Sequence, residues 1–192
     1  MSSVASGERT PRLPPGTWVI DTSVYTHMFR AGHGHMVGAR APGGTVIVPA
    51  DVNTEIEVGR AAYSNIPKVA SVPWARLAVL DEDEVGTQLV VKAALGGRPS
   101  AHLGECAVLA VAHHRGYMAL LDDRAAVAQA SLLGVPCHGT LWLVIEAHVK
   151  IFDRDEARTA QVVDDLLASG MHLPVKSGDE LLAWARKQGL LP

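Results

Sequence analysis

The stretch WVIDTSVY, residues 18–25, constrains the fold more than any other part of the sequence. Its apolar start predicts a buried β-strand over Trp18–Ile20, and the residues from Thr22 to Phe29 have a helical pattern. A carboxylate, Asp21, stands where the strand ends. Because ligands of open parallel sheets bind beyond the carboxyl ends of the strands, this acid is a first candidate for a functional site.

Short apolar runs and longer amphipathic runs alternate along the rest of the chain. We expect further strands over 45–48, 77–80, 117–121 and 135–138, and helices over 50–58, 82–95, 103–115, 124–133 and 141–151. This order predicts an α/β fold of three layers, in which helices cover both faces of a mainly parallel sheet. Two more helices, over 153–169 and 178–188, form a tail.

The composition is typical of a globular enzyme or binding domain. The chain has 192 residues, of which 48% are hydrophobic and 19% are charged. We expect a flexible N-terminal arm over 1–16, a main α/β domain over 17–152, and C-terminal helices over 153–192 that pack on the same domain. Cys106 and Cys137 are far apart and in apolar surroundings, which indicates reduced thiols.

Two further features restrict the class of protein. The N-terminus lacks the apolar core of a secretory signal, and no apolar run reaches the roughly 18–20 residues that cross a bilayer. We therefore expect a soluble, cytoplasmic protein without a membrane partner. The net charge is −3, from 17 basic and 20 acidic residues. Any polyanion must then be held by local basic groups or through cations.

Four acids besides Asp21 occupy positions next to expected strand ends or helix starts: Glu55, Glu105, Asp122 and Asp123. Each acid has a local explanation. Asp21 and one member of the Asp122/Asp123 pair can cap the helices that follow them, and Glu105 suits the positive end of a helix dipole. Glu55 can be a solvated helix residue.

Together the acids favour a shared role. In a parallel sheet, Asp21, Glu105 and the Asp122/Asp123 pair fall on one edge. Two carboxylates about 4 Å apart repel by roughly 4 kcal/mol at an effective dielectric near 20, so such a cluster must hold protons or a cation. Oxygen ligands without cysteine or histidine suit Mg²⁺ or Mn²⁺. An ion of this kind promotes phosphodiester hydrolysis.

Four motifs occur in a characteristic order: VIDTS at 19–23, VPADVNTEIE at 48–57, HLGECAVLAVAHHRGYMALLDDRAAVAQASLLGVPCHGT at 102–140 and LWLVIEAHVKIF at 141–152. This ordered set resembles the PIN-domain family, and specifically its VapC-type toxin ribonucleases and their close relatives. The resemblance implies a three-layer α/β/α nuclease domain over 17–152 with an acidic pocket for Mg²⁺ or Mn²⁺. It also implies cleavage of single-stranded RNA, a small cognate antitoxin protein and a homodimer, as in type II toxin-antitoxin systems.

By motif position, the acids of that pocket are Asp21, Glu55, Glu105 and one of Asp122 and Asp123. We assign Asp21, Glu105 and the Asp pair to the ion, because strand ends and helix starts are rigid. Glu55 is then the candidate that orients the attacking water. In the common pattern a Thr or Ser precedes the fourth acid by two positions, but Leu120 or Leu121 stands there, so the choice within the pair stays open.

Weaker candidates for substrate contact are Thr22, Ser23 and Arg124. The two hydroxyls can instead hold a ligand carboxylate or serve the helix start, and Arg124 can instead neutralise the adjacent acids. The other basic residues that flank the expected edge are Arg30, Arg40, Arg60, Lys68 and Arg98.

The segment 31–44 departs from the family pattern, because it is long and rich in Gly and His. We expect a flexible solvated loop there, in preference to a transition-metal site at His33 and His35. The alternative to a ribonuclease is a catalytically idle PIN-like module that binds RNA or a protein.

Overall fold

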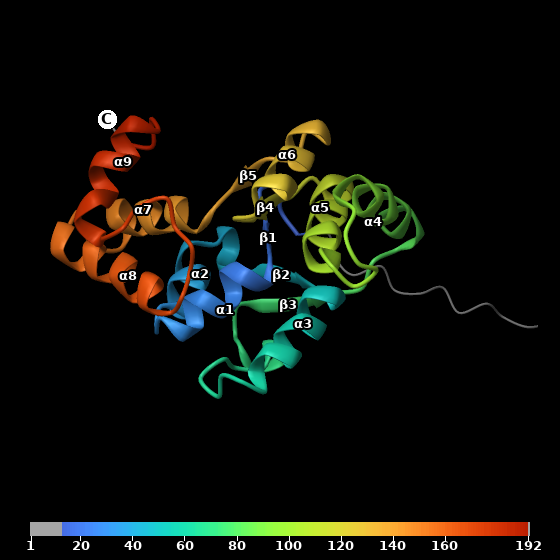
Figure 1. The fold of residues 1–192 in the computed structure, drawn as a ribbon, viewed down its shortest axis with the longest axis horizontal. Coiled ribbons are helices and arrows are strands. Elements are labelled where there is room, and N and C mark those ends of the chain that lie inside the picture. Colours follow the sequence, from blue (N-terminus) through green and yellow to red (C-terminus); the bar gives the residue numbers. More distant parts are fainter. Residues whose placement is uncertain (1–12, 192) are drawn as a thin grey trace, which may run out of the picture.

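The computed structural model describes residues 13–191, which form an α/β fold around a five-stranded parallel sheet (Figure 1). The strands are β1 (Trp18–Ile20), β2 (Val46–Pro49), β3 (Ala75–Ala78), β4 (Met118–Leu120) and β5 (Cys137–His138). They are ordered β3-β2-β1-β4-β5, and each neighbouring pair is parallel. The predicted fold class is therefore confirmed.

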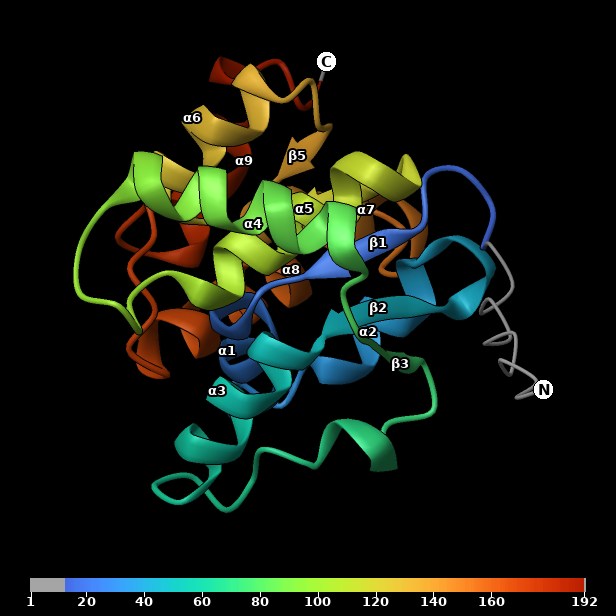
Figure 2. The same cartoon turned by 90° about the vertical axis from the view of Figure 1, so that its right-hand side faces the viewer.

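Helices cover both sides of this sheet. Those on one side contact one another: α4 (Glu82–Leu95), α5 (Leu103–Arg115) and α6 (Arg124–Leu132). Those on the other side contact one another in series: α1 (Thr22–Arg30), α2 (Gly34–Arg40), α7 (Thr140–Lys150) and α8 (Glu156–Ala168). Figure 1 shows β1 and β2 between α4 and α5 on the right and α7 and α8 on the left, and Figure 2 shows β1, β2 and β3 in succession.

The remaining elements lie at the edges. The helix α3 (Ala50–Arg60) contacts α1 and the strands β2 and β3, and α9 (Leu181–Lys187) contacts α8. Three short 3₁₀ helices connect longer elements: η1 (Pro42–Gly44), η2 (Val69–Ser71) and η3 (Gly178–Glu180).

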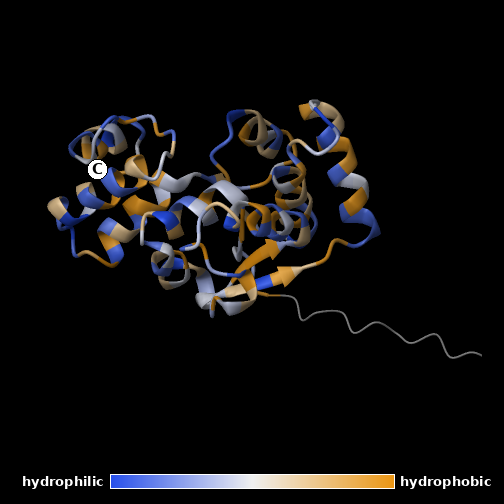
Figure 3. Ribbon diagram, turned by 60° about the horizontal axis from the view of Figure 1, so that its bottom comes forward, coloured by the Kyte–Doolittle hydropathy of each residue, from blue (hydrophilic) through white to orange (hydrophobic). Residues whose placement is uncertain are grey.

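The core follows from strands that are apolar on both faces. All three residues of β1 and all four of β2 are buried, as expected for strands of a parallel sheet with helices on each side. The strands are coloured mostly as hydrophobic in Figure 3. In α5, residues 106–112 are all buried, because this helix lies between the sheet and α4.

The edge strand β3 begins two residues before the expected run 77–80. Its register pairs Val46 with Ala75 and Pro49 with Ala78. Leu77 and Val79 are 52% and 80% exposed, so their apolar side chains do not mark core positions. The predicted bounds were wrong here because they were drawn around apolar residues that lie on the surface, whereas the buried ends of β3 are the small residues Ala75 and Ala78.

The segment 31–44 is not the flexible solvated loop that we expected. It contains α2, whose Met36 and Val37 are buried, and this helix packs on α7. His33 donates through Nε2 to Asp165 of α8 at 2.8 Å. Burial of two apolar side chains and this polar contact hold the segment in place, although its five glycines gave no helical signal.

The structure describes most of the C-terminal tail but only the last residues of the expected N-terminal arm. Residues 1–12 of the expected N-terminal arm lie outside the described residues, and the Leu13 N–H donates to the Tyr117 hydroxyl at 3.0 Å. The tail helix α8 contacts α7 and α1.

Cys106 and Cys137 are both free thiols. Within residues 13–191, no helix has the length and apolarity that a membrane crossing requires.

Candidate active site

The carboxyl ends of β1 and β4 are where the direction of the strand order reverses. From β1 the chain moves to β2 and β3 on one side, and it then returns to β4 and β5 on the other. Such a switch point is the usual binding site of an open parallel sheet. Asp21 follows β1, and Asp122 and Asp123 follow β4 closely, so the topology brings these three acids to one place.

Asp21 is 4% exposed and begins α1. Its Oδ2 accepts a hydrogen bond from the Ser23 N–H at 3.1 Å, so the predicted helix cap is confirmed. Its Oδ1 is buried and has no hydrogen-bond partner among the described residues. Burial, and then the charge of Glu105, raises the pKa of Asp21 to about 8. Asp21 is therefore a cap with one oxygen left for another ligand.

Asp122 and Asp123 are held in different ways. Asp122 accepts from the Thr140 N–H at 2.8 Å and from the Thr140 hydroxyl at 2.6 Å, with one oxygen each. Burial raises the pKa of Asp122, against the effect of these bonds. Asp123 is exposed, and its Oδ1 accepts from the Ala126 N–H at 2.8 Å as the cap of α6. Asp122 thus ties β4 to α7, whereas Asp123 keeps one oxygen outside the cap.

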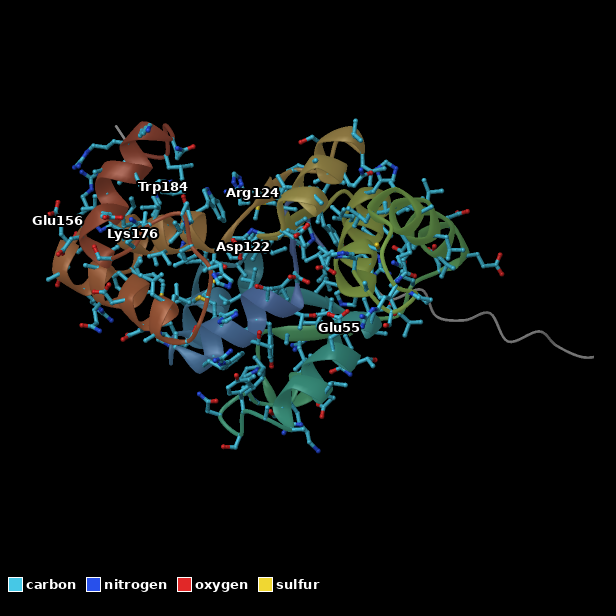
Figure 4. The ribbon with its side chains drawn as sticks, in the orientation of Figure 1. Glu55, Asp122, Arg124, Glu156, Lys176 and Trp184 are labelled. Atoms are coloured by element: carbon cyan, nitrogen blue, oxygen red, sulfur yellow. The ribbon has the colours of Figure 1, made fainter. Side chains whose placement is uncertain are left out.

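Glu55 connects three elements. From α3 it accepts a hydrogen bond from the Thr22 hydroxyl and, at 3.0 Å, from the Gly104 N–H at the start of α5. A Cβ at Gly104 would lie 2.6 Å from Glu55 Oε2, so a larger residue there would displace the Glu55 carboxylate from this hydrogen bond. Glu55 does not line the acidic pocket beyond β1 and β4. Thr22, whose hydroxyl donates to Glu55, does not line it either. Figure 4 shows Glu55 and Asp122 on separate elements.

A pocket of about 250 Å³ lies at the switch point. The predicted residues that line it are Asp21, Ser23, Glu105, Asp122 and Asp123. Glu105, in the first turn of α5, lies 3.5 Å from His102 Nδ1 through its Oε1. The structure thus brings together four of the five predicted acids.

Sequence reasoning missed the other residues that line this pocket. His27 of α1 and residues 170–172, which follow α8, also line it. Nothing in the run GMHLP at 170–174 marks a site. Gly139 and Thr140 were missed as well, although a Cβ at Gly139 would meet Asp122 Oδ1 at 2.6 Å. The adjacent pair Gly139-Thr140 was the available signal, because a glycine next to a hydroxyl donor admits a close carboxylate.

The chemistry of the pocket fits a hard divalent cation. The donors are carboxylate oxygens, and one of them, Asp21 Oδ1, is buried without a partner among the described residues. Among residues 13–191, no three His, Cys, Asp or Glu side chains form a ready ligand cluster. His33 and His35 are therefore not part of such a cluster either. Mg²⁺ keeps several waters and needs only one or two carboxylates, so the fit does not require a closed cage.

The basic residues are engaged elsewhere or exposed. Arg30 lies over the Tyr63 ring at 3.7 Å, Arg40 pairs with Glu146 at 2.6 Å, and Arg60 pairs with its neighbour Glu57. Arg124 is exposed and forms no ion pair with an acid in the described part of the chain. Neutralisation of the Asp pair by Arg124 is therefore not observed.

Comparison with known proteins assigns the class. A family model described as a PIN domain matches residues 17–187, which include the switch point, α8 and α9. The chain therefore belongs to the PIN-domain family, whose members are generally nucleases. Neither a curated protein nor a solved structure gives a significant match.

Proposed function

We propose that this protein is an endoribonuclease that hydrolyses phosphodiester bonds of single-stranded RNA with Mg²⁺ or Mn²⁺. The observation that carries the proposal is the buried, unpartnered oxygen of Asp21 in a pocket with Glu105, Asp122 and Asp123. A carboxylate in this setting requires a proton or a cation. Its pKa of about 8 favours the proton at neutral pH, until a cation displaces it.

The residues would divide the work as follows. Asp21, Glu105 and an acid of the Asp122/Asp123 pair would hold the ion. When bound, the ion polarises a phosphoryl oxygen and lowers the pKa of the attacking water. Glu55 accepts hydrogen bonds from Thr22 and Gly104 at the starts of α1 and α5, which supports a positioning role for it in addition to the predicted orientation of the attacking water.

We also propose that the protein is the toxin of a type II toxin-antitoxin system, with a small antitoxin protein as partner and a homodimer as its assembly. The resemblance of its motifs to VapC-type toxins supports this assignment. Exposed apolar side chains also support a partner, since Val85, Leu89 and Val90 of α4 are 40%, 63% and 68% exposed.

The test is cleavage of a panel of single-stranded RNAs in Mg²⁺, Mn²⁺ or EDTA. We expect Asp21→Asn to reduce cleavage about 100-fold or more, because the neutral amide does not attract the cation. The matched control is Asp51→Asn, since Asp51 lies in the first turn of α3 and does not line the pocket. Activity that persists both in EDTA and in Asp21→Asn would exclude the metal-dependent mechanism and favour the idle binding module.

A further inference from the structure

The pocket also contains a histidine, His27, whose protonated ring nitrogen can be derived from its contacts. Ser23 and His27 lie one turn apart on the same side of α1, and both line the pocket. His27 Nδ1 lies 2.8 Å from the Ser169 hydroxyl oxygen, directly after α8. The same hydroxyl oxygen lies 2.6 Å from the Leu166 carbonyl.

These two contacts fix the proton on the imidazole ring. A serine hydroxyl has one hydrogen, and a carbonyl oxygen can only accept. Both contacts are hydrogen bonds only if the Ser169 hydroxyl donates to the Leu166 carbonyl and the His27 Nδ1–H donates to the Ser169 oxygen. The neutral ring then carries its lone pair on Nε2, on the edge of the ring that Ser169 leaves free.

The surroundings keep this ring uncharged. Burial lowers the pKa of His27, and the nearby Arg30 and His172 lower it further. His27 therefore gives the pocket a neutral hydrogen-bond acceptor beside several carboxylates. A neutral acceptor can approach a phosphodiester without the charge repulsion that a carboxylate adds.

On the basis of the proposed ribonuclease function, we propose that His27 Nε2 accepts a hydrogen bond from a ribose 2′-hydroxyl of bound RNA, and that Ser169 positions the ring for it. The hydroxyl is a donor that RNA has and DNA lacks. Asp21 caps α1, His27 lies further along the same helix, and both side chains line the one pocket. A phosphate near the acids thus brings a ribose within reach of His27.

The acids themselves are poorly suited to this contact. Asp122 has both oxygens bonded to Thr140, and Glu55 is bonded to Thr22 and Gly104. The free oxygen of Asp21 is buried and suited to the cation. The His27 imidazole is therefore a neutral acceptor in the pocket that can recognise the sugar without competing for the ion.

The experiment measures binding and does not depend on cleavage. Labelled single-stranded RNA and copies with one 2′-deoxy or one 2′-O-methyl nucleotide, scanned along the strand, are titrated in Ca²⁺ at constant ionic strength. Fluorescence anisotropy gives each Kd, and gels establish that the strand stays intact. We expect both modifications to weaken binding about tenfold at one position, because neither can donate a hydrogen bond.

Variants assign this preference to the ring. His27→Leu should bind all three strands equally, and His27→Gln, which keeps an acceptor, should retain part of the preference. Ser169→Ala frees the ring and should reduce the preference a few-fold. His33→Leu is the control, because His33 pairs with Asp165 of α8 outside the acidic pocket and should keep the full preference. Thermal melts establish that each variant is folded.

Three results would overturn the proposal: a tenfold preference that persists in His27→Leu, a wild-type protein without any preference, or a preference that follows the base identity and not the sugar. Failure of the proposed function gives a different result. RNA that binds with a His27-dependent ribose preference but is never cleaved would exclude the ribonuclease activity and support the contact. Cleavage with an unchanged preference in His27→Leu would exclude only the contact.

Discussion

The two walls of the pocket differ in charge and in their origin along the chain. The wall at the sheet edge consists of acids at strand ends and helix starts, and Asp122 is fixed there by two hydrogen bonds from Thr140. The second wall consists of His27 and residues 170–172, and it is held by Ser169 at the end of α8. One wall is therefore anionic and belongs to the sheet, while the other is largely uncharged and depends on the tail.

This difference indicates a division of labour. Acids at a topological switch point attract a cation whatever the substrate is, because their carboxylates are held at the sheet edge before any substrate binds. Selection among substrates needs groups that distinguish one strand from another, and in our proposal His27 on the α1–α8 wall is such a group. The tail thus completes the pocket in addition to covering the core, and the two walls can be perturbed separately.

The largest effect is expected from the protonation of Asp21. In the unfolded chain its pKa is near 3.9, and in the folded protein it is about 8. Protonated Asp21 therefore stabilises the folded protein fully below about pH 4, and this contribution is lost as the pH rises through 8. Relative to Asp21→Asn, the free energy of unfolding of the wild type should fall by several kcal/mol between pH 5 and 8.5 in urea titrations without divalent cations.

A saturating divalent cation sharpens this prediction. It should stabilise the wild type more at pH 8.5 than at pH 5, because the cation binds the deprotonated acid. Asp21→Asn should respond little at either pH. If the free energy of unfolding changes with pH in the same way for the wild type and Asp21→Asn from pH 5 to 8.5, Asp21 is not the buried acid without a partner in the sheet-edge wall.

The Asp122/Asp123 pair gives the next largest effect. Asp123 resembles Asp21, because one of its oxygens caps a helix and the other stays outside the cap. We therefore predict that Asp123 binds the ion and that Asp122 is a positioning residue. Asp123→Ala should lose about 1 kcal/mol of stability together with ion affinity, whereas Asp123→Ser keeps the cap and should lose only the affinity, about tenfold.

Calorimetric titration with Mn²⁺ and urea unfolding separate these losses. Full ion affinity in Asp123→Ser would instead assign the ion to Asp122. That result would leave Asp21 as the only acid of the wall that both caps a helix and binds the ion.

The sheet-edge wall could be predicted from sequence, and the tail wall could not. Asp21, Glu105 and the Asp pair adjoin strand ends and helix starts, and the apolar runs that define those elements are visible in the chain. The chain gives no comparable marker for His27 and Ser169, because their pairing joins residues 142 positions apart. The helix α2 was missed for the same reason, since its stability comes from contacts with α7 and α8 and not from local propensity.

The smallest effect concerns the start of α8, and it tests whether the walls are independent. Asp155 caps this helix by accepting from the Arg158 N–H at 2.9 Å. Asp155→Ala should cost about 1 kcal/mol and speed hydrogen exchange in the first turn of α8, whereas Asp155→Ser should restore both. Because the acids are held by β1, β4 and α5, calorimetry should find the Mn²⁺ affinity unchanged. A loss of ion affinity as large as in Asp21→Asn would mean that the tail also organises the acids, and the two walls would then form a single cooperative unit.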